Sequence, residues 1–292
     1  MTATVATEQT PRAVQRRRLR RRFTRRPTAV LGLVGVVFFV LVALFGPLLS
    51  PGNPDATSYN EIFVSPFSAG HLLGTDDLGR DVLSRLIVGT RASMAAGVLA
   101  TSIAAVIGVF LGLFAGYYRG WLDTVVMRAT DVVLAFPFAI LAVGLASILG
   151  PSLSNAILAL AISLIPTFIR ITRAEVLGLR EQDYVQAAVV SGAAGGVIMF
   201  GHILRNCLAP LVVQASVAIP GSIIGAAMLS FLGLGEQPPT ASWGTMLSES
   251  QNYLSQAAWF AVIPGLAIAL ASLSFTMFGD GLRDVLDPRG DQ

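Results

Sequence analysis

The chain has 292 residues, of which 54% are hydrophobic and 13% charged, about half the charged share of soluble domains, and its mean hydropathy is +0.70. A soluble fold could not bury this much apolar surface, which predicts a protein whose solvent is lipid. All 20 basic residues are arginine, and a chain without lysine has neither a Walker-type phosphate loop nor a Schiff-base lysine.

Residues 1–27 form a polar tail that contains nine arginines. Such a run could bind nucleic acid, act as a twin-arginine export signal, or anchor a following membrane span on the cytoplasmic side. The next stretch, 28–49, is uncharged and apolar over 22 residues. A signal-peptide core has roughly 7–15 residues, whereas a membrane span needs about 20. The anchor is therefore the favoured interpretation, and no nucleic-acid partner is expected.

Five further apolar stretches follow, each bounded by charged residues or by a helix breaker. They cover residues 92–117, 125–149, 153–170, 208–232 and 257–278. The alternating polar pattern of a barrel is absent, so the expected fold class is all-α with six transmembrane helices. Residues 50–91 then form an irregular loop, 92–278 a core of five transmembrane helices with an inner loop at 171–206, and 279–292 a tail. No internal repeat and no separate soluble domain is evident.

The arginines predict the orientation of these spans. With the N-terminus inside, 17 of the 20 arginines lie on the inner side, and only Arg80, Arg85 and Arg91 lie outside. Positively charged segments remain cytoplasmic. Both termini are therefore expected in the cytoplasm and residues 50–91 outside a bacterial plasma membrane.

Ionisable side chains are scarce within the predicted spans. Arg128 and Asp131 are spaced i,i+3 near the inner end of the third span, which favours a local ion pair over a proton relay. The single cysteine, Cys207, excludes an intrachain disulfide, and two histidines are too few for a histidine-based metal site. A secondary transporter or channel would need buried coupling charges or a selectivity ring, and a membrane enzyme a convergent catalytic set. Neither pattern is visible, so an enzyme is not expected.

Prolines and small residues recur in the predicted spans. Prolines remove backbone donors and indicate either static kinks or a pathway lined by bent helices, between which the sequence does not decide. These residues are Pro137, Pro166, Pro210, Pro220 and Pro264. Gly221 and Gly225 form a GxxxG spacing that favours close helix packing. Three polar residues of the fifth span, Gln214, Ser216 and Ser222, are candidates for lining a pathway.

The inner segment 171–206 carries the most informative local pattern. Asp183, a possible helix cap, precedes Tyr184-Val185-Gln186-Ala187-Ala188; Gly192 follows, and then an apolar helix that reaches His202. Two short helices that meet at a glycine predict an elbow projecting from the membrane. Small residues at 187 and 188 would let another protein approach closely, although an interfacial amphipathic helix is an alternative.

Four stretches together resemble a known family. The pattern Gln186-Ala187-Ala188, Gly192, Ile203-Leu204 is similar to the "EAA" loop of bacterial ABC importer permeases. Three stretches resemble the C-type permeases of the dipeptide, oligopeptide and nickel importers: Gly74 to Asp81; Phe231 to Gly235 with Gln237-Pro238-Pro239 and Trp243-Gly244; and Gly279 to Asp284 with Asp287-Pro288. The resemblance runs from about residue 28 to residue 289.

The resemblance implies a type I ABC importer permease fold and a permease subunit that hydrolyses nothing itself. A homologous permease would enclose the pathway with it, ATP and Mg would be held by cytoplasmic ATP-binding subunits, and an extracellular solute-binding protein would deliver peptide. The coupling loop would comprise Tyr184, Gln186, Ala187, Ala188, Gly192, Ile203 and Leu204. The family also carries nickel chelates, so the solute is not fixed by the resemblance.

Two positions depart from the family pattern. The family often has Glu where Gln186 stands and Pro where Arg205 stands. Glutamine keeps the hydrogen-bonding length of glutamate but loses its charge, which puts a salt bridge from this position to an ATPase in doubt.

Overall fold

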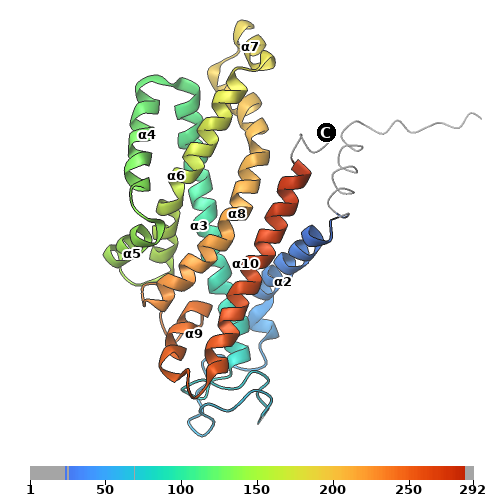
Figure 1. Ribbon diagram of the computed structural model, residues 1–292, viewed down its shortest axis with the longest axis vertical. Coiled ribbons are helices and arrows are strands. Elements are labelled where there is room, and N and C mark those ends of the chain that lie inside the picture. The colour runs from blue at the N-terminus through green and yellow to red at the C-terminus, as the bar shows by residue number, and fades with distance from the viewer. Residues whose placement is uncertain (1–23, 25, 69, 287–292) are drawn as a thin grey trace, which may run out of the picture.

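The computed structural model describes residue 24, residues 26–68 and residues 70–286. Within these residues the chain is helical, and the only strand-like pairings are two isolated bridges in the loop before the second long helix. The arginine runs of residues 1–23 and the Asp287-Pro288 motif lie outside the described residues. Figure 1 shows an elongated bundle with α7 at one end and α9 at the other, beside the loop 50–81. These are called here the elbow end and the loop end.

The helices follow the apolar stretches of the sequence. They are α2 (Pro27–Leu49), α3 (Val82–Tyr118), α4 (Gly120–Leu134), α5 (Phe138–Leu149), α6 (Leu153–Arg180), α7 (Asp183–Val190), the π-helix η1 (Val197–Ile203), α8 (Leu204–Phe231), α9 (Trp243–Ser250), the 3₁₀ turn η2 (Gln251–Tyr253) and α10 (Ala258–Leu286). Five helices, counting η1 with α8, are long and apolar enough to cross a membrane, and a sixth span results if α4 and α5 count as one.

Helix ends differ from the expected spans because caps, not charges, end a helix. α3 begins at Val82 instead of residue 92, since the Asp81 carboxylate accepts a hydrogen bond from the Ser84 amide at 2.7 Å. Arg85 and Arg91 therefore lie in a helix, not in the expected loop 50–91. α6 likewise runs to Arg180, ten residues beyond the expected span end at 170, so the inner loop is shorter than 171–206.

The expected third span, 125–149, is two helices. α4 and α5 meet at 92° across Ala135–Pro137, where the proline is the N-cap of α5 and has no N–H to donate. An ion pair between Arg128 and Asp131 was expected within this span, and that prediction was wrong about the partner of Asp131. Asp131 accepts from Arg170 of α6 at 2.7 Å, and Arg128 lies exposed. Asp123 pairs with Arg173 of α6 through two bonds of 2.5 and 2.6 Å, so ion pairs hold α4 beside α6.

Glycine allows α3 and α6 to pack closely. Gly108, Gly112 and Gly116 recur every fourth residue, and a methyl group on any of them would lie under 3.0 Å from atoms of α6. Of the two glycines in the GxxxG spacing found in the sequence, only one packs against another helix. Gly225 lies against Leu160, whereas Gly221 faces open space.

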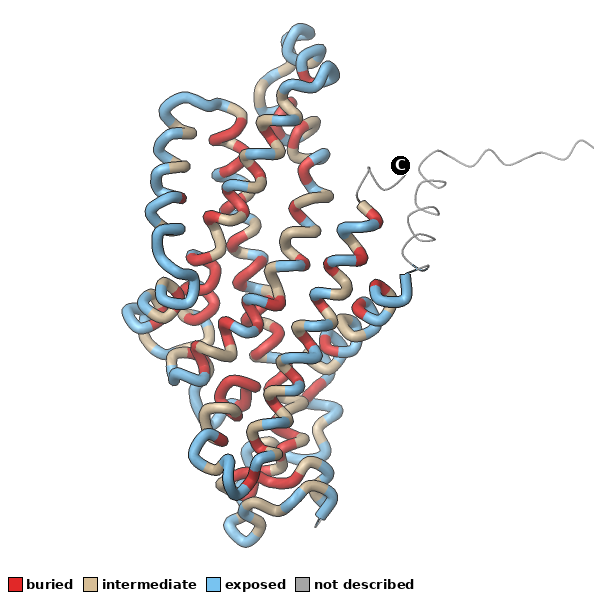
Figure 2. The backbone as a smooth tube through the Cα atoms, viewed as in Figure 1, coloured by how far each residue is buried: buried red, intermediate tan, exposed pale blue. Residues whose placement is uncertain are grey.

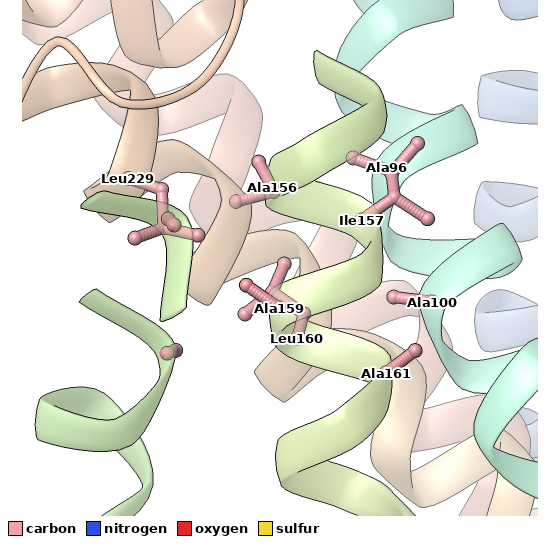
Figure 3. Close-up of a cluster of buried hydrophobic side chains, with 11 residues drawn as sticks. Ala96, Ala100, Ala156, Ile157, Ala159, Leu160, Ala161 and Leu229 are labelled. Atoms are coloured by element: carbon pink, nitrogen blue, oxygen red, sulfur yellow. The ribbon is translucent and has the colours of Figure 1, made fainter. Parts of the chain in front are cut away.

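The buried residues lie along the central helices. Figure 2 shows buried positions concentrated on α3, α6 and α8 and sparse on α4. The largest cluster, drawn in Figure 3, is alanine-rich, and leucine or isoleucine fills the spaces between helices α3, α5, α6 and α8. Small side chains let these helices approach without a large hydrophobic core, as in other membrane bundles.

Candidate functional site

A short helix that projects from the elbow end is the first candidate site. α7 begins after a turn at Glu181–Gln182 and ends at Val190. Its stop is a Schellman motif: the Gly192 amide donates to Val189 O at 3.0 Å and the Ala193 amide to Ala188 O at 3.1 Å. Gly192 has φ +80°, which explains why the sequence has glycine there. The predicted meeting of two helices at this glycine is thus a helix stop. The second helix is η1, which runs directly into α8.

The inner face of α7 is fixed to the bundle. Val185 is fully buried, and it shares an apolar cluster with Ile203, Cys207 and Val176. Ala188 and Leu204 pack partly buried against this cluster. Of the coupling-loop residues expected from the sequence, Ile203, Leu204 and Ala188 therefore anchor the elbow from within.

Polar contacts fix α7 from its sides. The Gln186 amide donates to the Arg180 carbonyl at 2.8 Å, a bond that a glutamate could not donate. Asn206 of α8 donates to the Tyr184 hydroxyl at 3.1 Å. Arg180 donates to Tyr117 O of α3 at 2.8 Å and lies 5.7 Å from the centre of its ring. The elbow is thereby tied to the ends of α3, α6 and α8.

The outer face of α7 is exposed and largely apolar. Ala187, Val189 and Val190 lie on it, and Val190 is 87% exposed. Tyr184 lies beside them, 42% exposed. A rigidly held helix with an exposed apolar face suits contact with another protein more than free solution. Ala187 and Val190 are thus exposed on this face, whereas Ala188 is partly buried.

The three polar residues of α8 occupy different environments. Ser222 is fully buried, and its hydroxyl lies 2.9 Å from that of Thr101 of α3. The Ser216 hydroxyl is buried against Gly279 of α10 and donates to Val213 O at 2.7 Å. Gln214 is half-buried. Both hydroxyls are used in packing between helices, and a role in lining a pathway stays a prediction for all three residues.

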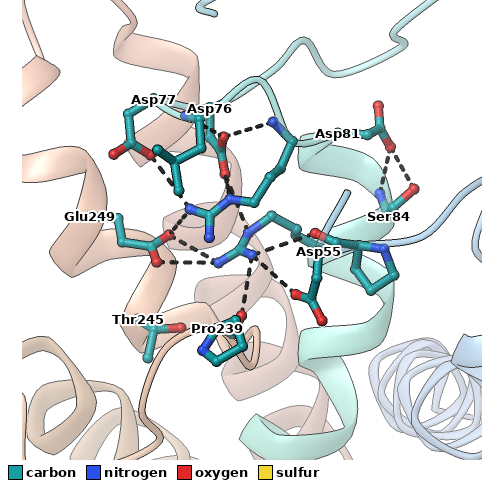
Figure 4. A network of polar contacts seen from close by, with 12 residues as sticks. Asp55, Asp76, Asp77, Asp81, Ser84, Pro239, Thr245 and Glu249 are labelled. Carbon is teal, nitrogen blue, oxygen red and sulfur yellow. Dashed lines mark hydrogen bonds and ion pairs between the residues drawn. The ribbon is translucent and has the colours of Figure 1, made fainter. Parts of the chain in front are cut away.

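A buried charge network at the loop end is the second candidate site, drawn in Figure 4. Arg80 donates to Asp76 at 2.5 Å and to Glu249 of α9 at 3.0 Å. Arg85 is fully buried, and it donates to the same Glu249 oxygen at 3.0 Å and to the Pro239 carbonyl at 3.4 Å. The Asp55 carboxylate lies 3.6 Å from Arg85. Two guanidinium groups thus join the loop 50–81, the start of α3 and α9.

Burial is the largest influence on the pKa of two carboxyl groups around these arginines. It raises the pKa of Glu249 above its ordinary value, although Arg85 and Arg80 act in the opposite direction. Burial and the neighbouring Asp76 raise the pKa of Asp77. Oxygens of Asp76, Asp77 and Glu249 lie within 4.8 Å of one another, close enough for a cation. Arg80 contacts all three carboxylates, so a guanidinium group already lies among the oxygens that such a cation would bind.

Sequence reasoning missed this network. It placed Arg80 and Arg85 among the outer-loop arginines and gave Glu249 no role. The local signal was the dense charged run Asp76-Asp77 to Arg80-Asp81, which follows the uncharged stretch 62–75. Its partner Glu249 is 169 residues away from Arg80, a distance that spacing along the chain does not bridge.

Comparisons with known proteins find matches over most of the chain. Residues 108–291 match the family described as binding-protein-dependent transport system inner membrane component, and residues 15–66 match the N-terminal transmembrane domain of oligopeptide transport permease C. The chain is 49% identical over 273 residues to the dipeptide transport system permease protein DppC of Escherichia coli K12, covering 91% of each chain. It is 43% identical over 261 residues to the DppC of Alkalihalophilus pseudofirmus, covering 89% of this chain and 86% of that protein.

A solved structure supports the fold. The methionine ABC transporter MetNI in an inward-facing conformation contains a chain that superposes with a TM-score of 0.55 at 21% identity. The match covers 69% of this chain and 96% of that one. The expected ABC importer permease fold is confirmed.

Proposed function

Because the chain belongs to the binding-protein-dependent transport system inner membrane components, and among them to the C-type dipeptide permeases, we propose that it forms half of the pathway of an ATP-driven peptide importer. It is a multi-pass inner-membrane protein and a non-catalytic permease subunit. The peptide substrate rests on the similarity to dipeptide permeases. A homologous permease supplies the other half.

The observation that carries the coupling proposal is the elbow helix α7. Its inner face is locked by Val185, and its outer face presents Ala187 and Val190. A cytoplasmic ATPase subunit, which binds the ATP and Mg, docks on this outer face and moves α7 with the attached ends of α3, α6 and α8. Gln186 acts inside the chain through its bond to Arg180 O, so the docking contact is apolar and needs no salt bridge at this position.

The proposed orientation follows from the arginines. The elbow end, with Arg119, Arg170, Arg173, Arg180 and Arg205, faces the cytoplasm together with both termini. The loop end then faces outward, where a solute-binding protein delivers peptide. The charge network holds the loop 50–81 and α9 as one surface for that encounter.

The test is an arginine on the exposed face of α7. Ala187→Arg keeps the buried anchors and places a charge in the proposed apolar contact. We expect uptake to be lost and the ATPase subunits to be absent from the purified complex, while the permease accumulates normally. Ala56→Arg, at an alanine of the loop end that is also exposed, is the matched control and should retain the ATPases. Normal ATPase recovery with Ala187→Arg would defeat the docking proposal and leave the family assignment intact.

A further inference from the structure

An apolar crevice lies between α2, α3, α9 and α10. Its volume is about 330 Å³, and nine of the ten residues that line it have apolar or aromatic side chains. The tenth, Thr90, donates its hydroxyl to Leu86 O at 2.8 Å. The indole N–H of Trp243, at the floor of the crevice, donates to the same carbonyl at 3.3 Å. The polar side-chain groups of the wall are therefore already bonded.

The crevice has the length of one membrane leaflet. On α2 it extends from Phe38 to Leu49, which at the helical rise is about 16 Å. This is roughly half of a hydrocarbon core about 30 Å thick. Leu49 is the last residue of α2, so the crevice starts at the loop-end surface and stops near the middle of the bilayer. Phe38 and Leu49 are 58% and 55% exposed, which leaves the crevice open to its surroundings.

Water is a poor occupant of this space. A buried water needs two to four polar partners, and the wall has none to spare. An empty space of this size would forfeit dispersion contacts along the whole wall. The medium around α2, a helix of mean hydropathy 2.8 in its most apolar window, is lipid.

We propose that the crevice binds one acyl chain of a phospholipid from the leaflet at the loop end. The chain lies along α2 with its far end against Phe38 and Phe39, and the buried Trp243 ring lies directly behind Phe39, edge to face with centroids 5.7 Å apart. The lipid fills the space between α2 and the remaining helices and so joins α2 to α3 beyond their contact at Gly46 and Ile87. This site lies in the loop-end half of the bundle and does not include the elbow.

Trp243 reports on the crevice from directly behind its wall. The indole is 0% exposed, and water-soluble quenchers should not reach it. The test uses the full chain with Trp121→Phe and Trp259→Phe, so that Trp243 is its single tryptophan. Trp259→Phe removes a buried N–H that has no hydrogen-bond partner, which makes it a tolerable change. The protein is reconstituted in phosphatidylcholine vesicles whose acyl chains carry bromine, a short-range quencher of indole fluorescence.

We expect brominated chains to quench Trp243 strongly while acrylamide in the water does not. Ala267→Phe, which fills the crevice from α10, should reduce the quenching by at least half. Ala269→Phe, at an exposed position of the same helix, should leave it unchanged. Quenching of Trp243 by acrylamide in Ala267→Phe would show that this substitution has disturbed the packing around the indole. In that case Val42→Phe, which fills the crevice from α2, is used as the filled variant instead.

Two results would overturn the proposal. The first is a Trp243 that is protected from both bromine and acrylamide, which would mean that protein, from this chain or another copy, covers the crevice. The second is equal quenching in the parent and in the folded filled variant, which would mean that bromine reaches the indole without entering the crevice.

Discussion

The glycine stripe of α3 gives the sharpest test of how the bundle is held together. A methyl group on Gly112 would lie 2.7 Å from the carbonyl oxygen of Ile169 and 2.7 Å from the Cβ of Thr172. One of these atoms is backbone, and the other is the branched Cβ of a fully buried side chain. Neither can rotate away, so Gly112→Ala forces α3 and α6 apart.

The magnitude follows from comparison with a glycine that has room. Overpacking of this kind costs about 1–3 kcal/mol, whereas replacing a helical glycine by alanine contributes about 0.5–1 kcal/mol of stability. Gly178→Ala in α6 receives only the second effect, because nothing lies within 4 Å of its added methyl group. The free energy of unfolding should therefore be about 1–3 kcal/mol lower for Gly112→Ala than for Gly178→Ala.

Equilibrium unfolding of the full chain in mixed micelles, followed by circular dichroism, measures this difference. Equal stability of the two variants would show that α3 and α6 are not in close contact at Gly112. The account of the bundle as a glycine-locked helix pair would then fail.

Two further variants test the two ends of the molecule. Glu249→Gln removes the carboxylate shared by two buried guanidinium groups, which costs up to about 3–5 kcal/mol, so limited proteolysis of the loop 50–81 should accelerate. Glu236→Gln, whose carboxylate makes no ion pair within the described part of the chain, should leave proteolysis unchanged. Gly192→Ala forces alanine to φ +80° at a cost of roughly 1–2 kcal/mol, and hydrogen exchange at the Ala193 amide should speed up. Gly196→Ala, at an ordinary helical φ of −61°, is the control, and equal exchange in both variants would contradict the assignment of a helix stop.

Most of the helices were predictable because the hydrocarbon core demands long apolar runs. Their ends were not, since a charge can lie inside a helix when a neighbouring helix or a cap satisfies it. Asp81 starts α3 from a polar loop, and Asp123 of α4 lets Arg173 remain within α6. The break at Pro137 was signalled by the proline, but its 92° angle depends on packing that the sequence does not display.

The elbow and the charge network differ in how far apart their residues lie along the sequence. Tyr184 to Gly192 lie within nine residues, so their pattern predicted a projecting elbow with a break at Gly192, and the structure shows that this break is a helix stop. The network needs Glu249 to meet Arg80 and Arg85, and that meeting depends on α9 folding back between α8 and α10. Ser216 and Ser222 show the same limit, because helical phase gives a face but not the neighbouring helix that the face meets.

If a partner displaces the elbow as proposed, the contacts of the elbow indicate which helices would move with it. The glycine stripe holds α3 against α6 through backbone, so a displacement of α7 carries both helices together with the start of α8. α4 is attached more weakly, through the half-exposed pair Asp131–Arg170 and the pair Asp123–Arg173. The exposed Asp131–Arg170 pair contributes about 0–1 kcal/mol, whereas the less exposed, two-bonded Asp123–Arg173 pair is the stronger of the two attachments. If the elbow moves as proposed, the Asp123–Arg173 pair therefore keeps the start of α4 beside α6, and the break at Pro137 would allow α5 to move independently of α4.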